Sequence, residues 1–231
     1  MRRNVEKKPG FNLFYLIIIA VILLIILYYV LNPLDKEGAP VAENSKKIEL
    51  FNGRDLSDWS FYLVDSTVDP SIIYYVQDDV INIEGEPFGY MKTKAEYEDY
   101  KLHLEWRWPG EESNSGVFLN ITGPDQKWPA TIECQLMAGN AGDFVFLGGS
   151  DAAERTDKEN RVILKIEESN EVTPGEWNAY DIINRNDSIM VYVNGVLQNS
   201  CTFPDPPKGH IGLQSEGGPV EFRNVYLVSY N

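Results

Sequence analysis

A strict two-residue alternation of apolar and polar side chains runs through residues 100–108. The apolar positions are Tyr100, Leu102, Leu104, Trp106 and Trp108, and the positions between them are Lys101, His103, Glu105 and Arg107. Alternation with this period is typical of a strand that has one face on a hydrophobic core. The chain is therefore expected to fold around β-structure.

Two further segments repeat the alternation. In residues 117–121 the core positions are Val117, Leu119 and Ile121, and in residues 131–137 they are Ile132, Cys134 and Leu136. If these strands share a sheet with residues 100–108, one face of it gathers His103, Glu105, Arg107, Asn120, Glu133 and Gln135. Such a collection of carboxylates, amides and a histidine is typical of a site for a polar ligand.

The rest of the chain after residue 46 also alternates in short segments separated by turn residues. Asn194-Gly195 lies between the apolar runs 189–193 and 196–197 and predicts a hairpin. No amphipathic helix of useful length and no fixed-period repeat is present. Around a dozen short strands with regular turns predict an all-β sandwich of two sheets, or a barrel.

The N-terminal region has a different character. Residues 13–31 are uninterrupted apolar or aromatic side chains, long enough to span a bilayer, and the basic residues Arg2, Arg3, Lys7 and Lys8 precede them. The run is longer than the apolar region of a signal peptide and no small-x-small cleavage site follows it. We therefore expect an uncleaved anchor in the inner membrane, with the following domain in the periplasm or otherwise outside the cytoplasmic membrane.

These patterns divide the chain into four parts. We predict a cytoplasmic N-terminus over 1–10, a transmembrane anchor over 11–31, a linker rich in Pro, Gly, Ala and charge over 32–46, and a sandwich domain over 47–231. The net charge of −15 argues against nucleic acid as a partner, because an acidic surface repels phosphates.

The metal-binding and cofactor-binding motifs of common enzymes are absent from the sequence. Only two histidines occur, and there is no G-x-S-x-G elbow, Walker A loop or GxGxxG segment, so no cofactor is expected and no metal ligands are assigned, although loop oxygens leave calcium open. Cys134 and Cys201 are expected to be packed free thiols, since two isolated cysteines do not make a disulfide framework.

The candidate chemistry therefore belongs to the polar side chains. Glu105 and Glu133 can act as acid, base or nucleophile where burial or a neighbouring carboxylate raises a pKa. The plainer alternatives are that Glu105 pairs with Arg107 on the same strand face and that His103 only makes a hydrogen bond. Trp128 either packs in the core or stacks on a sugar ring.

An ordered set of short motifs resembles a known family. The segment Leu50-Phe-Asn-Gly-Arg-Asp-Leu-Ser-Asp-Trp59 is similar to the opening motif of the 3-keto-disaccharide hydrolase family. The similarity continues through Glu105-Trp-Arg107, Asn114-Ser-Gly116, Glu133-Cys-Gln135, Gly175-Glu-Trp-Asn178, Val193-Asn-Gly195, Ile211-Gly-Leu-Gln214 and Val220-Glu-Phe-Arg-Asn224. Single motifs are weak, but their order and spacing over residues 48–228 are specific.

The resemblance implies a concanavalin A-like jelly-roll sandwich and an exported bacterial enzyme that cleaves 3-keto-glycosides. A ketone at C3 acidifies the hydrogen at C2, so a base can remove that proton and the C1 substituent leaves by β-elimination, after which water can add to the enone. We expect Glu133 to be the base and Glu105 or His103 its acid–base partner. Substrate-binding side chains are expected to be Arg107, Gln135, Asn114, Asn120 and Trp128.

No cofactor is required at that step, because a separate sugar 3-dehydrogenase would install the ketone. Two other functions fit the same residues. One is a non-catalytic carbohydrate-binding module, since sandwich folds host binding and catalysis alike. The other is an ordinary glycoside hydrolase that uses Glu105 and Glu133 as a carboxylate pair.

Overall fold

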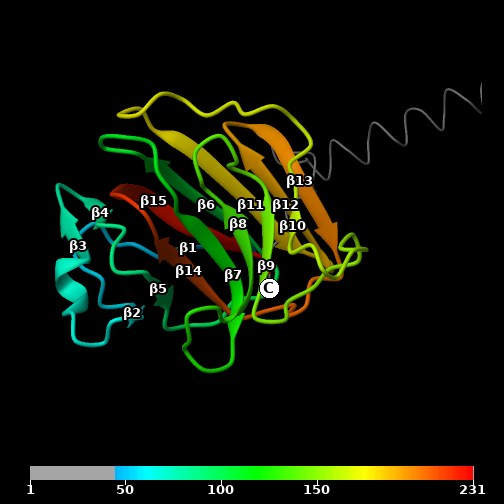
Figure 1. Cartoon of the computed structure of the whole chain (residues 1–231), viewed down its shortest axis with the longest axis horizontal. Coiled ribbons are helices and arrows are strands. Elements are labelled where there is room, and N and C mark those ends of the chain that lie inside the picture. The colour runs from blue at the N-terminus through cyan, green and yellow to red at the C-terminus, as the bar shows by residue number, and fades with distance from the viewer. Residues whose placement is uncertain (1–44, 231) are drawn as a thin grey trace, which may run out of the picture. The chain divides into compact units, whose positions relative to one another are not determined.

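Two antiparallel β-sheets stacked face to face make up the domain. The computed structural model describes residues 45–230, and the only helix in that part of the chain is the short 3₁₀ helix η1 (Pro70–Ile72). One sheet has eight strands, in the order β13 (Val196–Thr202), β12 (Ser188–Val193), β11 (Asn178–Arg185), β6 (Tyr100–Arg107), β15 (Val220–Ser229), β4 (Val80–Ile83) and β3 (Tyr74–Gln77), with β1 (Lys46–Glu49) also paired to β15 (Figure 1).

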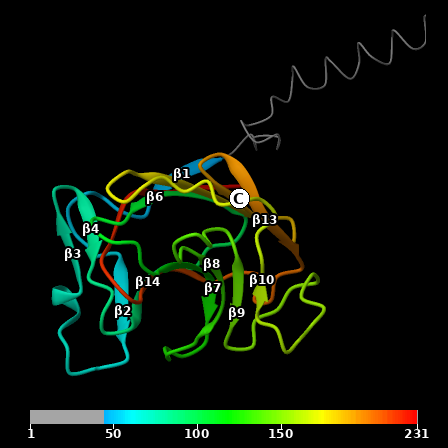
Figure 2. The same ribbon diagram turned by 45° about the horizontal axis from the view of Figure 1, so that its top comes forward.

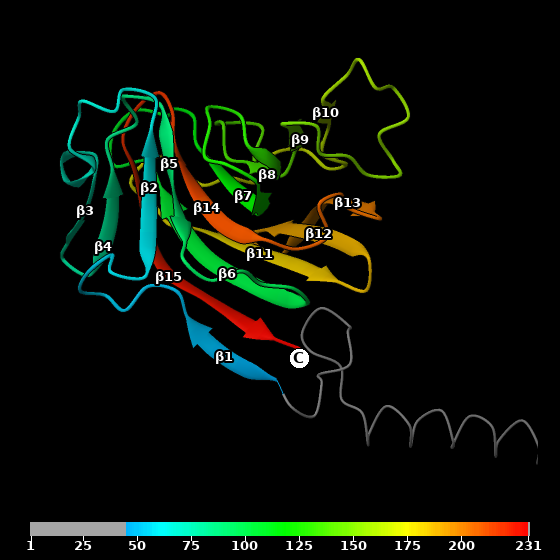
Figure 3. The same cartoon turned by 90° about the horizontal axis from the view of Figure 1, so that it is seen from below.

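The second sheet has seven strands and lies against the first (Figure 3). Its order is β10 (Val162–Ile163), β9 (Phe144–Leu147), β8 (Ala130–Gln135), β7 (Gly116–Thr122), β14 (His210–Ser215), β5 (Gly89–Thr93) and β2 (Trp59–Leu63). The prediction of an all-β sandwich is therefore confirmed.

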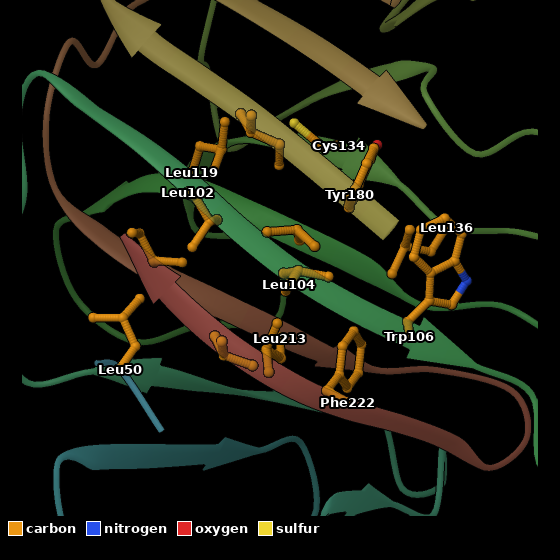
Figure 4. Packing of buried hydrophobic residues seen from close by; sticks show 14 of the residues in the cluster. Leu50, Leu102, Leu104, Trp106, Leu119, Cys134, Leu136, Tyr180, Leu213 and Phe222 are labelled. Atoms are coloured by element: carbon orange, nitrogen blue, oxygen red, sulfur yellow. The ribbon is translucent and has the colours of Figure 1, made fainter. Parts of the chain in front are cut away.

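The alternation in residues 100–108 marks a strand with one face on the core, as predicted. Buried and partly exposed residues alternate along the whole of β6. Its apolar side chains pack against apolar side chains of the seven-stranded sheet, and Figure 4 shows Leu102, Leu104 and Trp106 beside Leu119, Cys134 and Leu136. This core between the sheets is what holds each strand in its register.

The assumption that residues 100–108 share a sheet with residues 117–121 and 131–137 is wrong. Strand β6 is central in the eight-stranded sheet, whereas β7 and β8 are neighbours in the seven-stranded sheet. Their apolar sides face one another across the core, so their polar sides point in opposite directions. The predicted polar face is therefore two faces on opposite sides of the sandwich.

A second correction concerns Asn120 and Ile121. Asn120 has a positive φ of 58°, and the pairing of β7 with β8 shifts register between Leu119 and Thr122, which marks a β-bulge. The extra residue reverses the alternation, so Asn120 is fully buried and is joined to Asn184 of the opposite sheet at 2.9 Å. Ile121, predicted to face the core between the sheets, instead joins the apolar cluster on the outer face of its own sheet.

Both cysteines are free and buried, as predicted. The predicted cytoplasmic N-terminus, the anchor over 11–31 and nearly all of the linker lie outside the described residues, and these assignments remain predictions. Within residues 45–230, none of the helices has the length and apolar character needed to cross a bilayer.

Candidate functional site on the outer face of the seven-stranded sheet

The outer face of the eight-stranded sheet, which carries His103, Glu105 and Arg107, is a surface of paired charges. Arg223 donates from Nε to Glu105 Oε2 at 2.6 Å, and Asn224 donates to Glu105 Oε1 at 2.9 Å. Both carboxylate oxygens of Glu105 are therefore occupied by neighbours on the adjacent strand. The plainer alternative, that Glu105 pairs with Arg107, is wrong about the partner, because Glu105 pairs with Arg223 and Arg107 pairs with Glu221.

His103 and Arg107 are occupied in the same way. His103 Nδ1 lies 2.9 Å from Asp181 Oδ1 on the neighbouring strand, and Arg107 Nε donates to Glu221 Oε2 at 2.5 Å. Burial is the largest single influence on the pKa of Asp181 and would raise it. The hydrogen bond to His103 and the positive charge of Lys101 together outweigh burial, so this pKa lies below its usual range. The structure thus separates these residues from Glu133 and gives them cross-strand partners.

The outer face of the seven-stranded sheet carries Glu133, Gln135, Asn114 and Trp128, and Figure 2 shows six strands of this sheet, from β2 through β14, β7, β8 and β9 to β10. Strand pairing arranges its side chains in rows that run across the sheet. One row is Lys92, Gly212, Phe118, Glu133 and Val145, the next is Tyr90, Gln214, Gly116 and Gln135, and Asn114 pairs with Glu216 beyond them. Gly116 has no side chain, so it leaves an opening in this layer.

The carboxyl group of Glu133 occupies that opening. A Cβ placed on Gly116 would lie only 2.3 Å from Glu133 Oε1, so the glycine is required for the carboxyl to lie there. Glu133 is 3% exposed, and Oε1 has no hydrogen-bond partner within residues 45–230. Buried polar atoms in folded proteins are nearly always paired, so an unpaired one marks a place where a ligand or water is expected to bind.

Burial also changes the acidity of Glu133. Removal from water raises its pKa to about 8, and the nearby negative charge of Glu216 adds to the rise while Arg161 opposes it. The pKa of the half-buried Glu216 is raised as well, chiefly by burial, with Lys127, Arg161 and the Gln214 amide acting in the opposite direction. A carboxyl with a pKa near the working pH suits proton transfer.

Aromatic side chains lie on the same outer face as Glu133. An apolar cluster on the outer face contains Tyr90, Phe118, Ile121, Val145 and Leu147, with Tyr62, Trp128 and Val162 packed against it. Trp128 meets Phe88 edge to face at 4.8 Å, and the cations of Lys127 and Arg161 lie 5.4 Å and 5.9 Å from the centre of the Trp128 indole. Aromatic faces beside hydrogen-bonding groups are what a sugar ring requires.

Four of the predicted site residues are therefore brought together. Glu133, Asn114 and Gln135 share the outer face with Trp128, and the Oδ1 atom of Asn114 is also buried without a partner in the described residues. Gln135 is partly committed, because its Oε1 accepts hydrogen bonds from the backbone of Leu136 and Met137. Asn120 lies apart from them because of the bulge, with its amide donating to the carbonyl of Pro206 at 2.9 Å.

Sequence reasoning did not assign Glu216 or Gln214 to the site. Gln214 is at an outward position, next to the core residue Leu213, and could have been found from the alternation in residues 211–214 once this strand was placed beside residues 116–122. Glu216 follows the last residue of β14 and belongs to no alternating pattern. Within residues 45–230, no group of three or more His, Cys, Asp or Glu side chains is placed to hold a metal ion.

Comparison with known proteins gives a family and a fold. Residues 46–228 match the model of the family described as 3-keto-alpha-glucoside-1,2-lyase-like domain. A search of curated protein sequences finds no match.

Among solved structures, two from Parabacteroides distasonis ATCC 8503, both named as candidate glycosyl hydrolases, are similar to this chain. One has 22% identity and a TM-score of 0.59, covering 80% of this chain and 99% of that one; the other has 20% identity and a TM-score of 0.55, covering 78% and 92%. The carbohydrate-binding module CBM66 from Bacillus subtilis has 11% identity and a TM-score of 0.51 over 73% of this chain and 93% of its own. At these identities the likeness shows a shared sandwich fold.

Proposed function

Since the chain belongs to the 3-keto-alpha-glucoside-1,2-lyase-like family, we propose that it cleaves 3-keto-glycosides on the outer face of its seven-stranded sheet. The observation that carries the proposal is the carboxyl of Glu133, which is buried on the face that carries the aromatic cluster and has one oxygen unpaired in the described structure. In its ionised form, this carboxylate has an oxygen free to accept a proton from a bound substrate.

Glu133 is the base in this mechanism. The hydrogen at C2 of a 3-keto sugar is weakly acidic, and a carboxylate whose pKa is raised to about 8 is a stronger base than an ordinary one. Removal of the C2 proton gives an enolate at C3. Its collapse restores the ketone, forms the C1–C2 double bond and breaks the bond from C1 to the leaving oxygen, to which Glu133 returns the proton.

Glu216 replaces Glu105 and His103 as the partner of Glu133 in this proposal. Its negative charge helps to keep the pKa of Glu133 high, and so keeps the base strong. Trp128 and the aromatic cluster would cover the sugar ring and exclude water. Asn114 Oδ1, buried and unpaired in the described part of the chain, can accept a hydrogen bond from a sugar hydroxyl.

The substrate must be supplied by another enzyme, and cleavage would take place outside the cytoplasmic membrane. A separate oxidoreductase must install the ketone at C3, because elimination needs the carbonyl already present. The apolar run over residues 13–31 would anchor the enzyme in the cytoplasmic membrane with the sandwich domain on the outer side.

A direct test is to incubate the full-length chain with a glycoside and with its 3-keto derivative. Cleavage of the keto form alone is expected, together with exchange of its C2 hydrogen with deuterated solvent. Cleavage of both would indicate a glycosidase, in which case Glu133 and Glu216 are the carboxylate pair to examine, since Glu105 lies on the opposite face. Binding without cleavage or exchange would indicate a carbohydrate-binding module.

A further inference from the structure

The side-chain amide of Gln214 is fully buried, and neither its Nε2 nor its Oε1 makes a hydrogen bond of normal geometry within residues 45–230, although the amide lies near enough to Glu216 to lower the pKa of that carboxyl. A buried amide with both ends unpaired is costly to the folded state. Such an amide is suited to take a hydrogen-bond partner from a bound ligand.

The position of Gln214 relative to Glu133 follows from strand pairing. Leu213 pairs with Val117 and Glu216 pairs with Asn114 in one continuous register, so Gln214 lies opposite Gly116. The carboxyl of Glu133 reaches over Gly116 from the other neighbouring strand. Glu133 and Gln214 thus come from the two strands on either side of Gly116, which has no side chain to separate them.

Within residues 45–230, Gln214 Nε2 is also the one buried side-chain donor on this face that makes no hydrogen bond of normal geometry. In the described part of the chain, the other buried side-chain donors without a partner are on Tyr74, Tyr100 and Trp106. All three belong to the core between the two sheets and cannot meet a ligand on the outer face. The amide of Gln214 is therefore the donor that remains for a ligand oxygen beside Glu133.

We propose that Gln214 Nε2 donates a hydrogen bond to the C3 oxygen of the substrate and stabilises the enolate formed when Glu133 removes the C2 proton. This inference rests on the proposed function. C2 and C3 are bonded to one another, so the base for the C2 proton and the donor for the C3 oxygen must be close neighbours, as Glu133 and Gln214 are. Gln214 Oε1, which can only accept, is left for a sugar hydroxyl.

The expected energetics follow from the charge that develops during the reaction. The C3 oxygen is a neutral carbonyl in the bound substrate and carries negative charge in the enolate. A hydrogen bond to it therefore strengthens as the proton leaves, which lowers the barrier more than it tightens substrate binding. We therefore expect Gln214 to affect kcat more than KM. A sugar with a hydroxyl at C3 cannot form the enolate, so it gains less from this donor than a 3-keto sugar does.

The test is the variant Gln214→Met, which keeps side-chain length and removes both hydrogen-bonding atoms. We expect kcat on a 3-keto-glycoside to fall by roughly 10²–10³, the usual effect of losing one oxyanion donor, with a smaller change in KM. Exchange of the C2 hydrogen with deuterated solvent should slow by a similar factor, and Tm should stay equal or rise because an unpaired buried amide has been removed.

Gln198→Met is the matched control. Gln198 is equally buried but lies in the other sheet, and its Nε2 donates to the carbonyl of Glu168 and to Asn170 Oδ1. Its replacement should lower Tm and leave kcat per folded molecule unchanged. Wild-type kcat and exchange in Gln214→Met, or losses no larger than those of the control, would overturn the role of Gln214 while leaving the proposed function intact. A wild-type chain that neither exchanges nor cleaves would overturn both.

Discussion

The two outer faces of the sandwich carry similar residue types and differ in how those residues are paired. On the eight-stranded sheet, Glu105 is bound by Arg223 and Asn224. On the seven-stranded sheet, Glu133 is more deeply buried and keeps an unpaired oxygen in the described structure. A carboxylate that already has its partners is stabilised in its resting form, whereas an unpaired buried one is held ready for a ligand. Pairing, more than residue type, separates the candidate site from a stabilised surface.

Replacement of the two carboxylates should show this difference most strongly. Glu133→Gln keeps shape but removes the proton acceptor, so cleavage of a 3-keto-glycoside should fall by roughly 10²–10⁴. Glu105→Gln should leave the rate of the folded protein close to that of the wild type. Steady-state kinetics of both variants measure the contrast, and equal losses would mean that the outer face of the eight-stranded sheet takes part in the reaction.

The second prediction concerns the opening at Gly116. A methyl group there would meet Glu133 Oε1, so Gly116→Ala should displace the carboxyl and lower kcat/KM by roughly 10², the usual effect of a misplaced catalytic group. Gly110→Ala is the control, because a Cβ at Gly110 meets no atom of the described chain within 4 Å. Unchanged activity in Gly116→Ala would show that the position of the carboxyl is not critical.

The third prediction uses the coupling between Glu133 and Glu216. The ionised form of Glu133 is the base, so kcat/KM should decrease as pH falls through about 8. Glu216→Gln removes the nearby negative charge, lowers the pKa of Glu133 and should move this decrease to lower pH, with a several-fold gain in relative activity at acidic pH. A pH profile that keeps the wild-type midpoint would show that Glu216 does not act on Glu133.

The raised pKa of Glu133 should also make stability depend on pH. The pKa of Glu133 in the folded chain is above that of an exposed glutamate, so the folded state gains stability from its proton below about pH 4.5 and loses that gain as pH rises to about 8. Glu133→Gln should therefore raise Tm by several degrees at pH 8 and change it little at pH 4. A lower Tm at pH 8 would instead indicate a structural role for Glu133.

The smallest effect is expected from the paired charges of the eight-stranded sheet. Glu105 and Arg223 are partly exposed, so their ion pair should contribute at most about 1 kcal/mol. A double-mutant cycle with Glu105→Gln and Arg223→Gln, read by denaturant unfolding, measures this coupling. A much larger coupling energy would mean that solvent is excluded from this face, for example by a bound partner.

The sequence predicted the sandwich well, because alternation reports directly which side of a strand meets the core. It did not report which sheet a strand joins, and strands with the same pattern, β6 and β8, lie in different sheets. The bulge at Asn120 was hidden for a related reason, since one extra residue reverses the alternation without changing composition. Glu216 lies in a turn, where position depends on the folded chain as a whole rather than on a local pattern.

The bulge at Asn120 also has a consequence for how relatives of this chain can diverge. It lies in the same strand as Gly116, but at the end that leads into the segment carrying Trp128. Insertion or loss of a residue at the bulge would re-aim that segment and leave Gly116 and Glu133 where they are. Under the proposed function, substrate choice and proton transfer would depend on separate places along one strand, so the first could change while the second is kept.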